Sequence, residues 1–441
     1  MNFLYLFADQ LQAFALGCMG NQHIHTPNLD ALAADGVLFR NAYSDSPVCT
    51  PFRGCLMTGQ YPTESGITAN GDGIRPGQRC IGHSLNDAGY RSSYVGKWHL
   101  GATGNVPIPR ENRAGFTDFI GYQCYNSFID KVHFYDEDGL EHRLEKHRTT
   151  ATTDLAIDRL RKIQDNSFAL FVSYQNPHYP MEPDPAFAAL YARAELPARE
   201  NVNPATPPFT ATWSPHSPRP VERDPNFQRY GRSLDEFRRL YYAMVTQLDH
   251  EIGRLIRYLK NQDLYEKTLI IFTSDHGEMM GSHGRMNKGT PDEESARVPM
   301  IARAPGGLRG HAVHTPVSAG IDIWPTLVDC AGYEESTPLS GHSWKAALYD
   351  EAPSLRPPVI AEHPWPSGPH QGRSWVMIRE GDWKLVADKE SLEVITLHNL
   401  TQDPCELHDL TEDAPDEVNA SLFQHLKVWQ HKVKAASRRF S

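Results

Sequence analysis

The chain has 441 residues, of which 40% are hydrophobic and 22% are charged. This length and composition allow a large buried core and fit one large domain followed by a smaller one. The formal net charge of -11 at pH 7, with no basic run that would neutralise a phosphate backbone, argues against a nucleic-acid-binding protein. An acidic protein that handles an anionic substrate must therefore concentrate its positive charge locally.

No stretch of the sequence approaches the roughly 20 consecutive apolar residues that a membrane-spanning helix needs. The first apolar run is not preceded by a charged leader. We therefore expect no membrane partner. The expected location is the cytoplasm for the chain as it stands, and the periplasm or the exterior if a signal peptide has been removed.

The seven cysteines show none of the paired short spacings that are typical of a zinc site. If Cys49 is set aside for chemistry, six remain. These six can pair in an oxidising compartment or stay reduced in a cytosol.

Strand and helix patterns alternate along the first two thirds of the chain. Apolar runs predict four buried strands, at residues 2–8, 90–95, 168–174 and 268–273. Thr26-Pro27 is typical of a helix start, and Gly36 is placed to end that helix. A capping box at 233–236 predicts a long helix whose apolar residues recur every three or four positions: Leu240, Met244, Leu248, Ile252, Leu255 and Leu259.

This alternation predicts an α/β fold with a large, mainly parallel sheet sandwiched by helices. Residues 179–232 interrupt it with a proline-rich insertion that shows no sustained periodicity. We expect a catalytic domain over 1–345 and a C-terminal subdomain over 346–441. The subdomain is expected to hold a small antiparallel sheet, with strands at 375–378, 383–386 and 394–397, and a closing helix near 416–434.

Polar residues of catalytic type follow each of the four predicted strands. They are Asp9-Gln10, Lys97-Trp98-His99, Asn176-Pro177-His178 and Asp275-His276. Any one of them alone is more simply a loop residue with a satisfied hydrogen bond. Parallel strands would bring all four to one edge, which is where open α/β sheets bind their ligands.

Asp9, Gln10, Asp275 and His276 offer two carboxylates, an amide oxygen and an imidazole. This mostly oxygen-donor set suits a hard divalent ion. Calcium is the first expectation, and the imidazole leaves manganese or magnesium open.

Cys49 is followed by Thr-Pro-Phe-Arg53, with Pro51 where the first turn of a helix would begin. Cys49 is therefore expected at a helix N-terminus, where free N–H groups and the helix dipole favour an anion. Such a cysteine is either a buried structural residue, the usual fate of cysteine, or a nucleophile or its precursor. Spacing alone does not decide between them.

The motif Cys49-x-Pro51-x-Arg53 followed by Thr58-Gly59 resembles the signature of type I sulfatases, in which the cysteine is oxidised to formylglycine. Similar blocks occur in family order over nearly the whole chain, more weakly in 101–165, 179–232 and the last hundred residues. They are Ala8-Asp9-Gln10, 26–33, 96–101, Asn176-Pro-His178, 273–278, 288–291 and 294–299. The resemblance implies the fold of the alkaline phosphatase superfamily.

The resemblance also implies a mechanism. One hydroxyl of hydrated formylglycine at position 49, a ligand of the metal, would attack sulfur and expel the alcohol. Deprotonation of the second hydroxyl would then let the sulfated hemiacetal collapse, which releases sulfate and reforms the aldehyde. Arg53 would steady the hydrate, and Lys97 and Lys288 would neutralise developing charge. His99 would act as base, while His178 or Lys288 would protonate the leaving group. A formylglycine-generating maturation enzyme is the implied protein partner.

The sequence departs from the family pattern at two positions. Many relatives carry two adjacent aspartates where this chain has Asp9-Gln10, which removes one charge from the implied metal site. Phe52 stands where Ser or Ala is commoner in the signature. Cys49, Pro51 and Arg53 are retained, and conversion to formylglycine is therefore still expected.

Two functions other than that of a sulfatase are compatible with parts of this pattern. A phosphonate monoester or phosphodiester hydrolase of the same superfamily would resemble this chain in its signature and metal residues. Such relatives tend to lack the pair Lys97 and His99, whose presence favours sulfate esters. A binding protein without turnover is opposed by the presence of a nucleophile, metal ligands and acid–base candidates together.

The substrate is expected to be a sulfated small molecule or saccharide, with a sulfated carbohydrate favoured over an aryl or alkyl (choline-type) sulfate. Recognition is expected from the insertion after His178 and from residues 362–373, because loops on a rigid scaffold usually carry it. Trp365 would stack on a sugar, or would simply pack the two subdomains together. His363, His370 and Arg373 would bond hydroxyl groups or a carboxylate.

Overall fold

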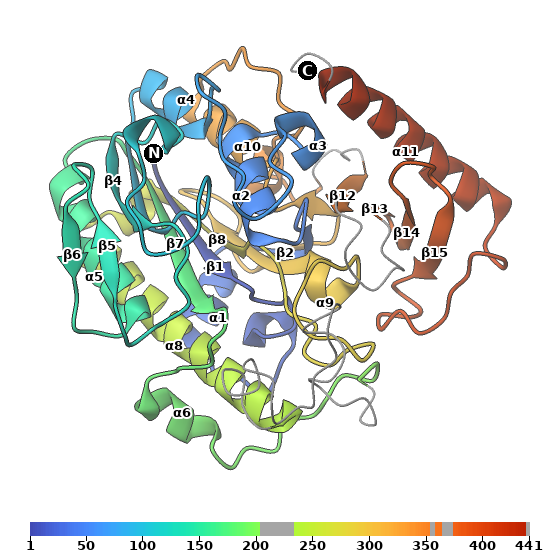
Figure 1. Cartoon of the computed structure of the whole chain (residues 1–441), viewed down its shortest axis with the longest axis horizontal. Coiled ribbons are helices and arrows are strands. Elements are labelled where there is room, and N and C mark those ends of the chain that lie inside the picture. The colour runs from blue at the N-terminus through green and yellow to red at the C-terminus, as the bar shows by residue number, and fades with distance from the viewer. Residues whose placement is uncertain (203–232, 353–357, 364–373, 438–441) are drawn as a thin grey trace.

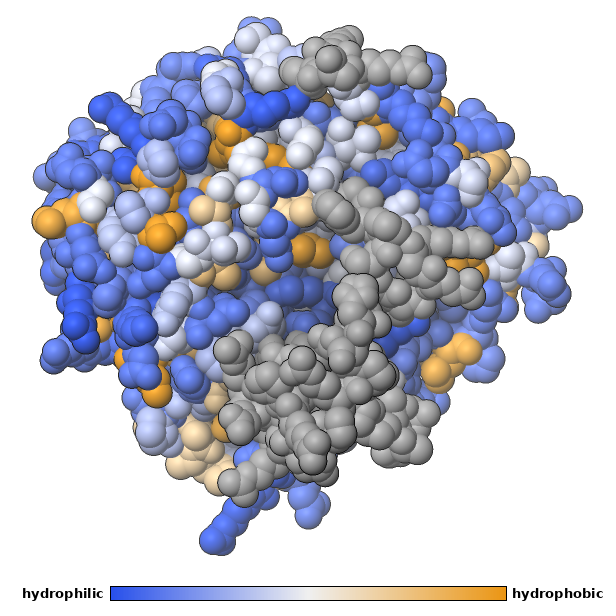
Figure 2. Space-filling model, viewed as in Figure 1, coloured by the Kyte–Doolittle hydropathy of each residue, from blue (hydrophilic) through white to orange (hydrophobic). Residues whose placement is uncertain are grey.

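The computed structural model describes residues 1–202, 233–352, 358–363 and 374–437 (Figure 1). Within these residues a large sheet is covered by helices on both faces, and a small antiparallel sheet lies beside it with the last helix. Among the described helices we find none with the length and apolar character that crossing a membrane requires. The face seen in Figure 2 carries its hydrophobic side chains scattered among hydrophilic ones.

The strands and helices have the following bounds. The strands are β1 (Asn2–Asp9), β2 (Val37–Tyr43), β3 (Arg91–Lys97), β4 (Asp118–Tyr122), β5 (His133–Tyr135), β6 (Glu141–Arg143), β7 (Phe168–Pro177), β8 (Thr268–Ser274), β9 (Arg297–Arg303), β10 (His311–Val313), β11 (Val317–Ser318), β12 (Val359–His363), β13 (Trp375–Glu380), β14 (Trp383–Asp388) and β15 (Val394–Asn399). The helices are α1 (Pro27–Ala34), α2 (Cys49–Thr58), α3 (Pro62–Ser65), α4 (Ile81–Asp87), α5 (Arg148–Ile163), α6 (Pro185–Tyr191), α8 (Leu234–Asn261), α9 (Glu293–Ala296), α10 (Ile323–Ala331) and α11 (Asp416–Ser437).

The large sheet is mainly parallel in its centre, as predicted. Its described strands run in the order β10-β2-β9-β8-β1-β7-β3-β4-β5-β6, and β11 pairs with β2. The run β8-β1-β7-β3-β4 is parallel throughout, so these five strands end at one edge. β9 is antiparallel to both β8 and β2, and β5 and β6 form an antiparallel extension at the other side. The fold class predicted from the sequence is confirmed.

Strand β1 shows why this sheet is buried on both faces. Its even-numbered residues, such as Leu4 and Leu6, join the core beneath α1, α5 and α8. The odd-numbered Phe3, Tyr5 and Phe7 point to the opposite core, which contains residues of α2, α4 and α10. Side chains alternate along a strand, so a continuous apolar run of this kind fits only a strand that is covered on both faces.

The long helix α8 begins as the sequence predicts, because the Ser233 hydroxyl accepts a hydrogen bond from the Glu236 amide at 3.1 Å. The start of α1 differs from the expectation. Thr26 precedes Pro27 but makes no side-chain cap. Asp249 of α8 caps α1 instead, accepting from the Leu29 amide at 2.7 Å, so the two helices are joined by a tertiary contact.

The C-terminal sheet is antiparallel, in the order β12-β13-β14-β15, and α11 packs on it. Three of its strands and α11 lie where the sequence predicts them, whereas β12 was not predicted. Residues of this sheet and α11 share a core with Cys55 and Tyr61. The small sheet is thereby fixed next to α2 and α3. The domain boundary at residue 345 stays a prediction.

The insertion after His178 is less irregular than its sequence suggests. Helix α6 lies within it and begins at the cap residue Asp184, whose side chain accepts from the Ala186 amide at 2.9 Å. Residues 203–232 of this insertion lie outside the described residues. All seven cysteines are described, and each is a free thiol.

Candidate active site

The polar residues that follow β1, β3, β7 and β8 meet at the shared carboxyl edge of the sheet. Asp9 is the last residue of β1 and lies beside Pro177 of β7. Gln10 and His99 have positive φ angles of 69° and 54°, so the chain turns sharply as it leaves β1 and β3. These turns direct the side chains into one buried site, as the strand-end argument predicts.

Cys49 is the first residue of α2, and Pro51 lies in its first turn. Its side chain is buried, and the sulfur lies 3.2 Å from His276 Nε2 and 3.3 Å from Lys288 Nζ. Burial opposes ionisation, but the cations of Lys288 and Lys97 hold the pKa of the Cys49 thiol well below its usual value. Position 49 is therefore built to carry an anionic or strongly polarised group.

Asp9, Cys49, Asp275 and His276 each direct one ligand atom to a common point, with all four atoms within 4.8 Å of one another. His276 Nδ1 lies 3.0 Å from the Gly277 carbonyl, an acceptor, so this nitrogen carries a proton. Nε2 then faces Asp275 Oδ1 at 3.5 Å and Asp9 Oδ1 at 3.7 Å. Two carboxylates and an imidazole nitrogen that converge in a buried space fit a divalent ion.

Two further cations hold the carboxylates of this cluster in place. Arg53, one turn along α2 from Cys49, contacts Asp9 at 3.3 Å and Asp275 at 3.2 Å and donates to the Lys97 carbonyl at 2.7 Å. Lys97 Nζ forms an ion pair with Asp9. Although burial disfavours the charged amine, the Asp9 carboxylate holds the pKa of Lys97 well above its usual value. The site thus keeps fixed positive charge beside the cysteine.

Gln10 is oriented by hydrogen bonds at both ends of its amide. Its nitrogen donates to a Glu278 oxygen and, at 3.3 Å, to Asn287. Its oxygen accepts from Lys288 Nζ at 2.7 Å. The amide oxygen therefore points to Lys288, which bridges Gln10 and the Cys49 sulfur.

The two predicted acid–base histidines are both buried near the cysteine. His178 Nδ1 lies 2.7 Å from the Tyr179 carbonyl. Burial and the Lys288 cation lower the pKa of His178 to about 4, so its imidazole is neutral at pH 7. Among the described residues, His99 Nδ1 has no hydrogen-bond partner although it is buried.

The predicted substrate residues are only partly described. His363, the last residue of β12, is buried, its ring stacks on Trp375 at a centroid distance of 5.9 Å, and its edge lies near Gly289. The Trp375 indole donates to the Gly289 carbonyl at 3.1 Å, so the small sheet contacts the loop that carries Lys288. Trp365, His370 and Arg373 lie outside the described residues.

Some residues of the site were not predicted from the sequence. Glu278 orients Gln10, and Ser173 of β7 accepts from Arg53 at 2.9 Å. Tyr241 of α8 donates to the Gln10 carbonyl at 2.6 Å. Glu278 lies two residues after His276, which is the one hint that the sequence offers. The others come from strands or helices whose side-chain direction only the fold determines.

A cysteine at a helix N-terminus beside a buried cluster of metal-ligand type, at the carboxyl edge of a parallel sheet, is an arrangement suited to nucleophilic, metal-assisted hydrolysis. The sulfatase family model matches residues 1–333, and a model described as N-sulphoglucosamine sulphohydrolase, C-terminal, matches residues 281–432. The first match covers well over half of the chain. The chain therefore belongs to the sulfatase family and is a sulfuric ester hydrolase.

Similar proteins extend over almost the full length of the chain. An uncharacterized sulfatase, YidJ, of Escherichia coli is 31% identical over 461 residues, covering 100% of this chain and 89% of that protein. An N-acetylglucosamine-6-O-sulfatase of Bacteroides thetaiotaomicron is 25% identical over 496 residues, covering 98% and 87%.

Solved structures agree with the fold. A putative sulfatase, YidJ, of Bacteroides fragilis superposes with a TM-score of 0.83 at 25% identity, covering 99% of this chain and 97% of that chain. A phosphonate monoester hydrolase of Silicibacter pomeroyi gives a TM-score of 0.76 at 25% identity, covering 98% and 95%. The fold is thus shared with a hydrolase of phosphorus esters, the alternative that the sequence raises.

Proposed function

We propose that this sulfatase hydrolyses the sulfate ester of a carbohydrate with a formylglycine made from Cys49 and a divalent ion, with calcium as the first choice and manganese or magnesium as alternatives. The observation that carries the proposal is the position of the Cys49 sulfur. It lies at the start of α2, 3.2 Å from His276 Nε2 and 3.3 Å from Lys288 Nζ. In this proposal the sulfur stands where an oxygen of the hydrated aldehyde would lie.

Asp9, Asp275 and His276 would hold the ion together with the Gln10 amide oxygen and the group at position 49. A divalent ion would supply Lewis-acid activation of the attacking oxygen and would neutralise charge on the sulfuryl group. The carboxyl and amide oxygens in this set support a hard ion such as calcium. Arg53 and Lys97 would keep both carboxylates ionised and oriented.

The hydrated formylglycine would supply one hydroxyl that attacks sulfur and a second whose deprotonation lets the aldehyde reform with loss of sulfate. His99 is proposed as the base for the second hydroxyl, because its Nδ1 is buried and has no partner among the described residues. Lys97 and Lys288 would stabilise the negative charge on the transferring group. The motif Cys49-x-Pro51-x-Arg53 supports a formylglycine-generating enzyme as the partner that oxidises the thiol.

His178 and Lys288 are the two candidates for protonating the leaving alcohol. Lys288 carries a proton at neutral pH, because the charges of Cys49 and Asp9 raise its pKa against the effect of burial. His178 is neutral in the free site, and a bound sulfate anion would favour its protonation. The neutral resting state of His178 favours Lys288 as the donor.

The carbohydrate assignment rests on the N-acetylglucosamine-6-O-sulfatase relative and on the place of His363. His363 extends from the small sheet to the loop of Lys288, so the C-terminal subdomain borders the site. A panel of sulfated mono- and disaccharides beside an aryl sulfate and choline sulfate tests this assignment. If no sugar is desulfated while a small ester turns over well, the carbohydrate assignment fails and the sulfatase assignment stands.

The likeness to a phosphonate monoester hydrolase supports a second candidate reaction. The two reactions are separated by comparing kcat/KM on one aryl leaving group that carries sulfate, a phosphonate monoester or a phosphodiester. The pair Lys97 and His99, which such relatives tend to lack, supports the sulfate ester instead. A clear preference for the phosphorus esters would overturn the assignment.

A further inference from the structure

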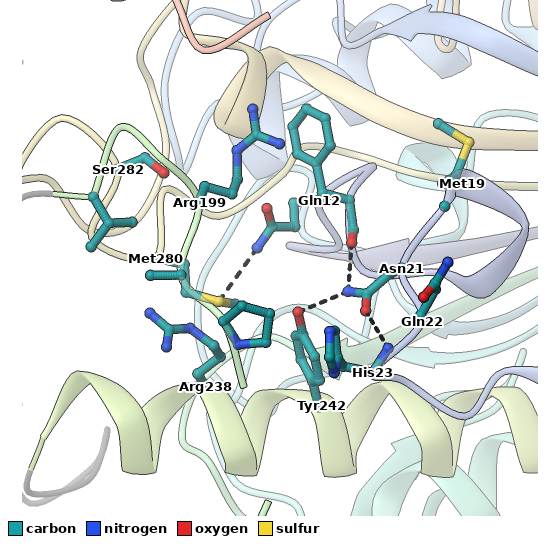
Figure 3. A pocket seen from close by; sticks show the side chains of 15 residues that line it. Gln12, Met19, Asn21, Gln22, His23, Arg199, Arg238, Tyr242, Met280 and Ser282 are labelled. Carbon is teal, nitrogen blue, oxygen red and sulfur yellow. Dashed lines mark hydrogen bonds between the residues drawn. The ribbon is translucent and has the colours of Figure 1, made fainter. Parts of the chain in front are cut away.

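A second pocket lies next to the active site, between α8, the loop that follows β1 and the loop that follows β8 (Figure 3). Its volume is about 410 Å³, within the usual range for small-molecule sites. Gln12 and Met280 line it, each two residues beyond a residue of the active site, Gln10 and Glu278 respectively. The sulfatase reaction assigned above gives this pocket no role.

The charge of its lining is the first indication of what the pocket binds. Among the described residues the lining contains Arg199, Arg238 and His23 but no aspartate or glutamate. Arg199 is paired with buried Glu294 at 2.6 Å. Arg238 is 4% exposed and donates to the Leu196 carbonyl at 3.1 Å, and its one acidic partner in the described part of the chain is the exposed Asp235 at 3.2 Å. In a chain of net charge -11, a buried guanidinium without a buried carboxylate favours an anionic ligand.

The hydrogen-bonding groups around Arg238 are the second indication. Tyr242 follows Arg238 by one turn of α8, so both side chains lie on the same face of the helix (Figure 3). The Tyr242 hydroxyl accepts from Asn21 at 2.8 Å, which leaves its own proton for a ligand. Both arginines also act to lower the pKa of Tyr242 against the larger effect of burial, so their charge reaches the hydroxyl.

Gln12 supplies a buried acceptor on the opposite side of the pocket. It is 4% exposed, and its amide nitrogen contacts the Met280 sulfur at 3.5 Å (Figure 3). Its amide oxygen is buried and has no hydrogen-bond partner among the residues that the structure describes. A buried, unsatisfied acceptor costs about 1–3 kcal/mol, and a donor from a ligand would remove this cost.

We propose that this pocket is a second binding site, separate from the nucleophile, for an acidic sugar. The anionic group pairs with Arg238, and the ring hydroxyls bond Gln12 and Tyr242. A guanidinium for the acid, together with an amide acceptor and a phenol donor for hydroxyls, matches a ligand that is both charged and hydroxyl-rich. A neutral sugar lacks the group that Arg238 binds, and a fully ionised anion such as sulfate lacks the hydroxyl donor that satisfies Gln12.

Titration calorimetry with sodium glucuronate, which carries no sulfate ester for the enzyme to hydrolyse, tests the proposal on the full-length protein. We expect saturable binding of glucuronate and at least tenfold weaker binding of glucose. Arg238→Gln should weaken glucuronate binding at least tenfold. Arg257→Gln removes the same charge from an exposed position on the same helix and should leave it unchanged.

Two further variants separate this pocket from the active site and from a folding defect. Asp275→Ala changes a residue of the proposed metal cluster and should bind glucuronate with the affinity of the parent protein. This expectation does not depend on the proposed reaction. Tyr242→Phe removes one hydroxyl and should weaken glucuronate binding severalfold. This variant takes the place of Arg238→Gln if the latter does not fold. Absence of saturable binding overturns the proposal. Binding that Asp275→Ala abolishes, or that both Arg238→Gln and Tyr242→Phe leave unchanged, also overturns it.

Discussion

The amide nitrogen of Gln10 donates a hydrogen bond to the Glu278 carboxylate, and both side chains are buried. This contact fixes which end of the amide faces the metal cluster, so the Gln10 oxygen is directed to Lys288. Where many sulfatases have a second aspartate, this chain therefore has a neutral ligand candidate that is held by an acidic residue behind it.

Exchanging the two side chains tests this contact. Gln10→Glu would place two carboxylates against each other in a buried space. We expect at least a tenfold loss of activity and a loss of about 1–3 kcal/mol in the free energy of unfolding. Glu278→Gln in the same chain restores a donor across the contact and should recover most of the stability in urea unfolding. Additive losses in the double variant would contradict the pairing.

Removal of a metal ligand should separate folding from ion binding. Asp275→Ala is expected to give a folded protein that no longer retains the ion and has lost nearly all activity, because the ligand atoms of Asp9 and His276 remain without the second carboxylate. Metal content by atomic emission and the circular dichroism spectrum measure the two properties. Asp158→Ala, an exposed position on α5, serves as the control. If Asp275→Ala retains the ion, the metal binds at another site.

The proton donor can be identified by varying the leaving group. Loss of the general acid should reduce kcat on a poor alcohol leaving group by about 10²–10⁴-fold and should matter little for 4-nitrophenol, which leaves without a proton. Lys288→Ala should slow both substrates, because Lys288 also stabilises charge on the transferring group, and we expect its loss to be larger on the poor leaving group. For His178→Ala we expect a weaker dependence on the leaving group. If the steady-state kcat depends more strongly on the leaving group for His178→Ala than for Lys288→Ala, His178 is the general acid.

Stability should depend on pH through Asp249, which caps the start of α1. Burial raises the pKa of Asp249 to about 6, against the hydrogen bonds it accepts at the start of α1. Between pH 4 and 6 the folded chain thus holds a proton that the unfolded chain releases, and stability falls as pH rises, by about 3 kcal/mol for this group.

Asp249→Asn should remove the pH dependence of stability that comes from Asp249. From pH 4 to pH 6.5 the free energy of unfolding of the variant should therefore rise relative to that of the parent. Urea unfolding at several pH values measures it. A difference that does not change with pH would show that the Asp249 pKa is the same in the folded and unfolded states.

The sequence predicted those parts of the site that follow from local patterns. Each apolar run ends at its polar residue, so the meeting of Asp9, Lys97, His178 and Asp275 could be expected from a parallel sheet. Pro51 marks the start of α2, but only the family resemblance implied that Cys49 belongs with them. In contrast, β2 was missed because Arg40 and Asn41 interrupt its apolar pattern. Its pairing with β9 depends on residues about 260 positions away.

Other features depend on side-chain directions that no local pattern encodes. The Asp249 cap of α1 and the Tyr241 hydroxyl beneath Gln10 both come from α8, where their spacing is that of an ordinary helix. Glu278 reads in the sequence as a loop carboxylate. Only the fold shows that it is buried against the Gln10 amide. The roles of the predicted acid–base residues stay predictions that the variants above test.

The state of Cys49 tests the central claim most directly. The protein should be co-expressed with a formylglycine-generating enzyme, and the tryptic peptide that contains Cys49 should be weighed by mass spectrometry. We predict the mass of an aldehyde residue at position 49 and sulfatase activity in proportion to the converted fraction. A peptide that remains entirely cysteine in a preparation with full activity on sulfate esters would contradict it.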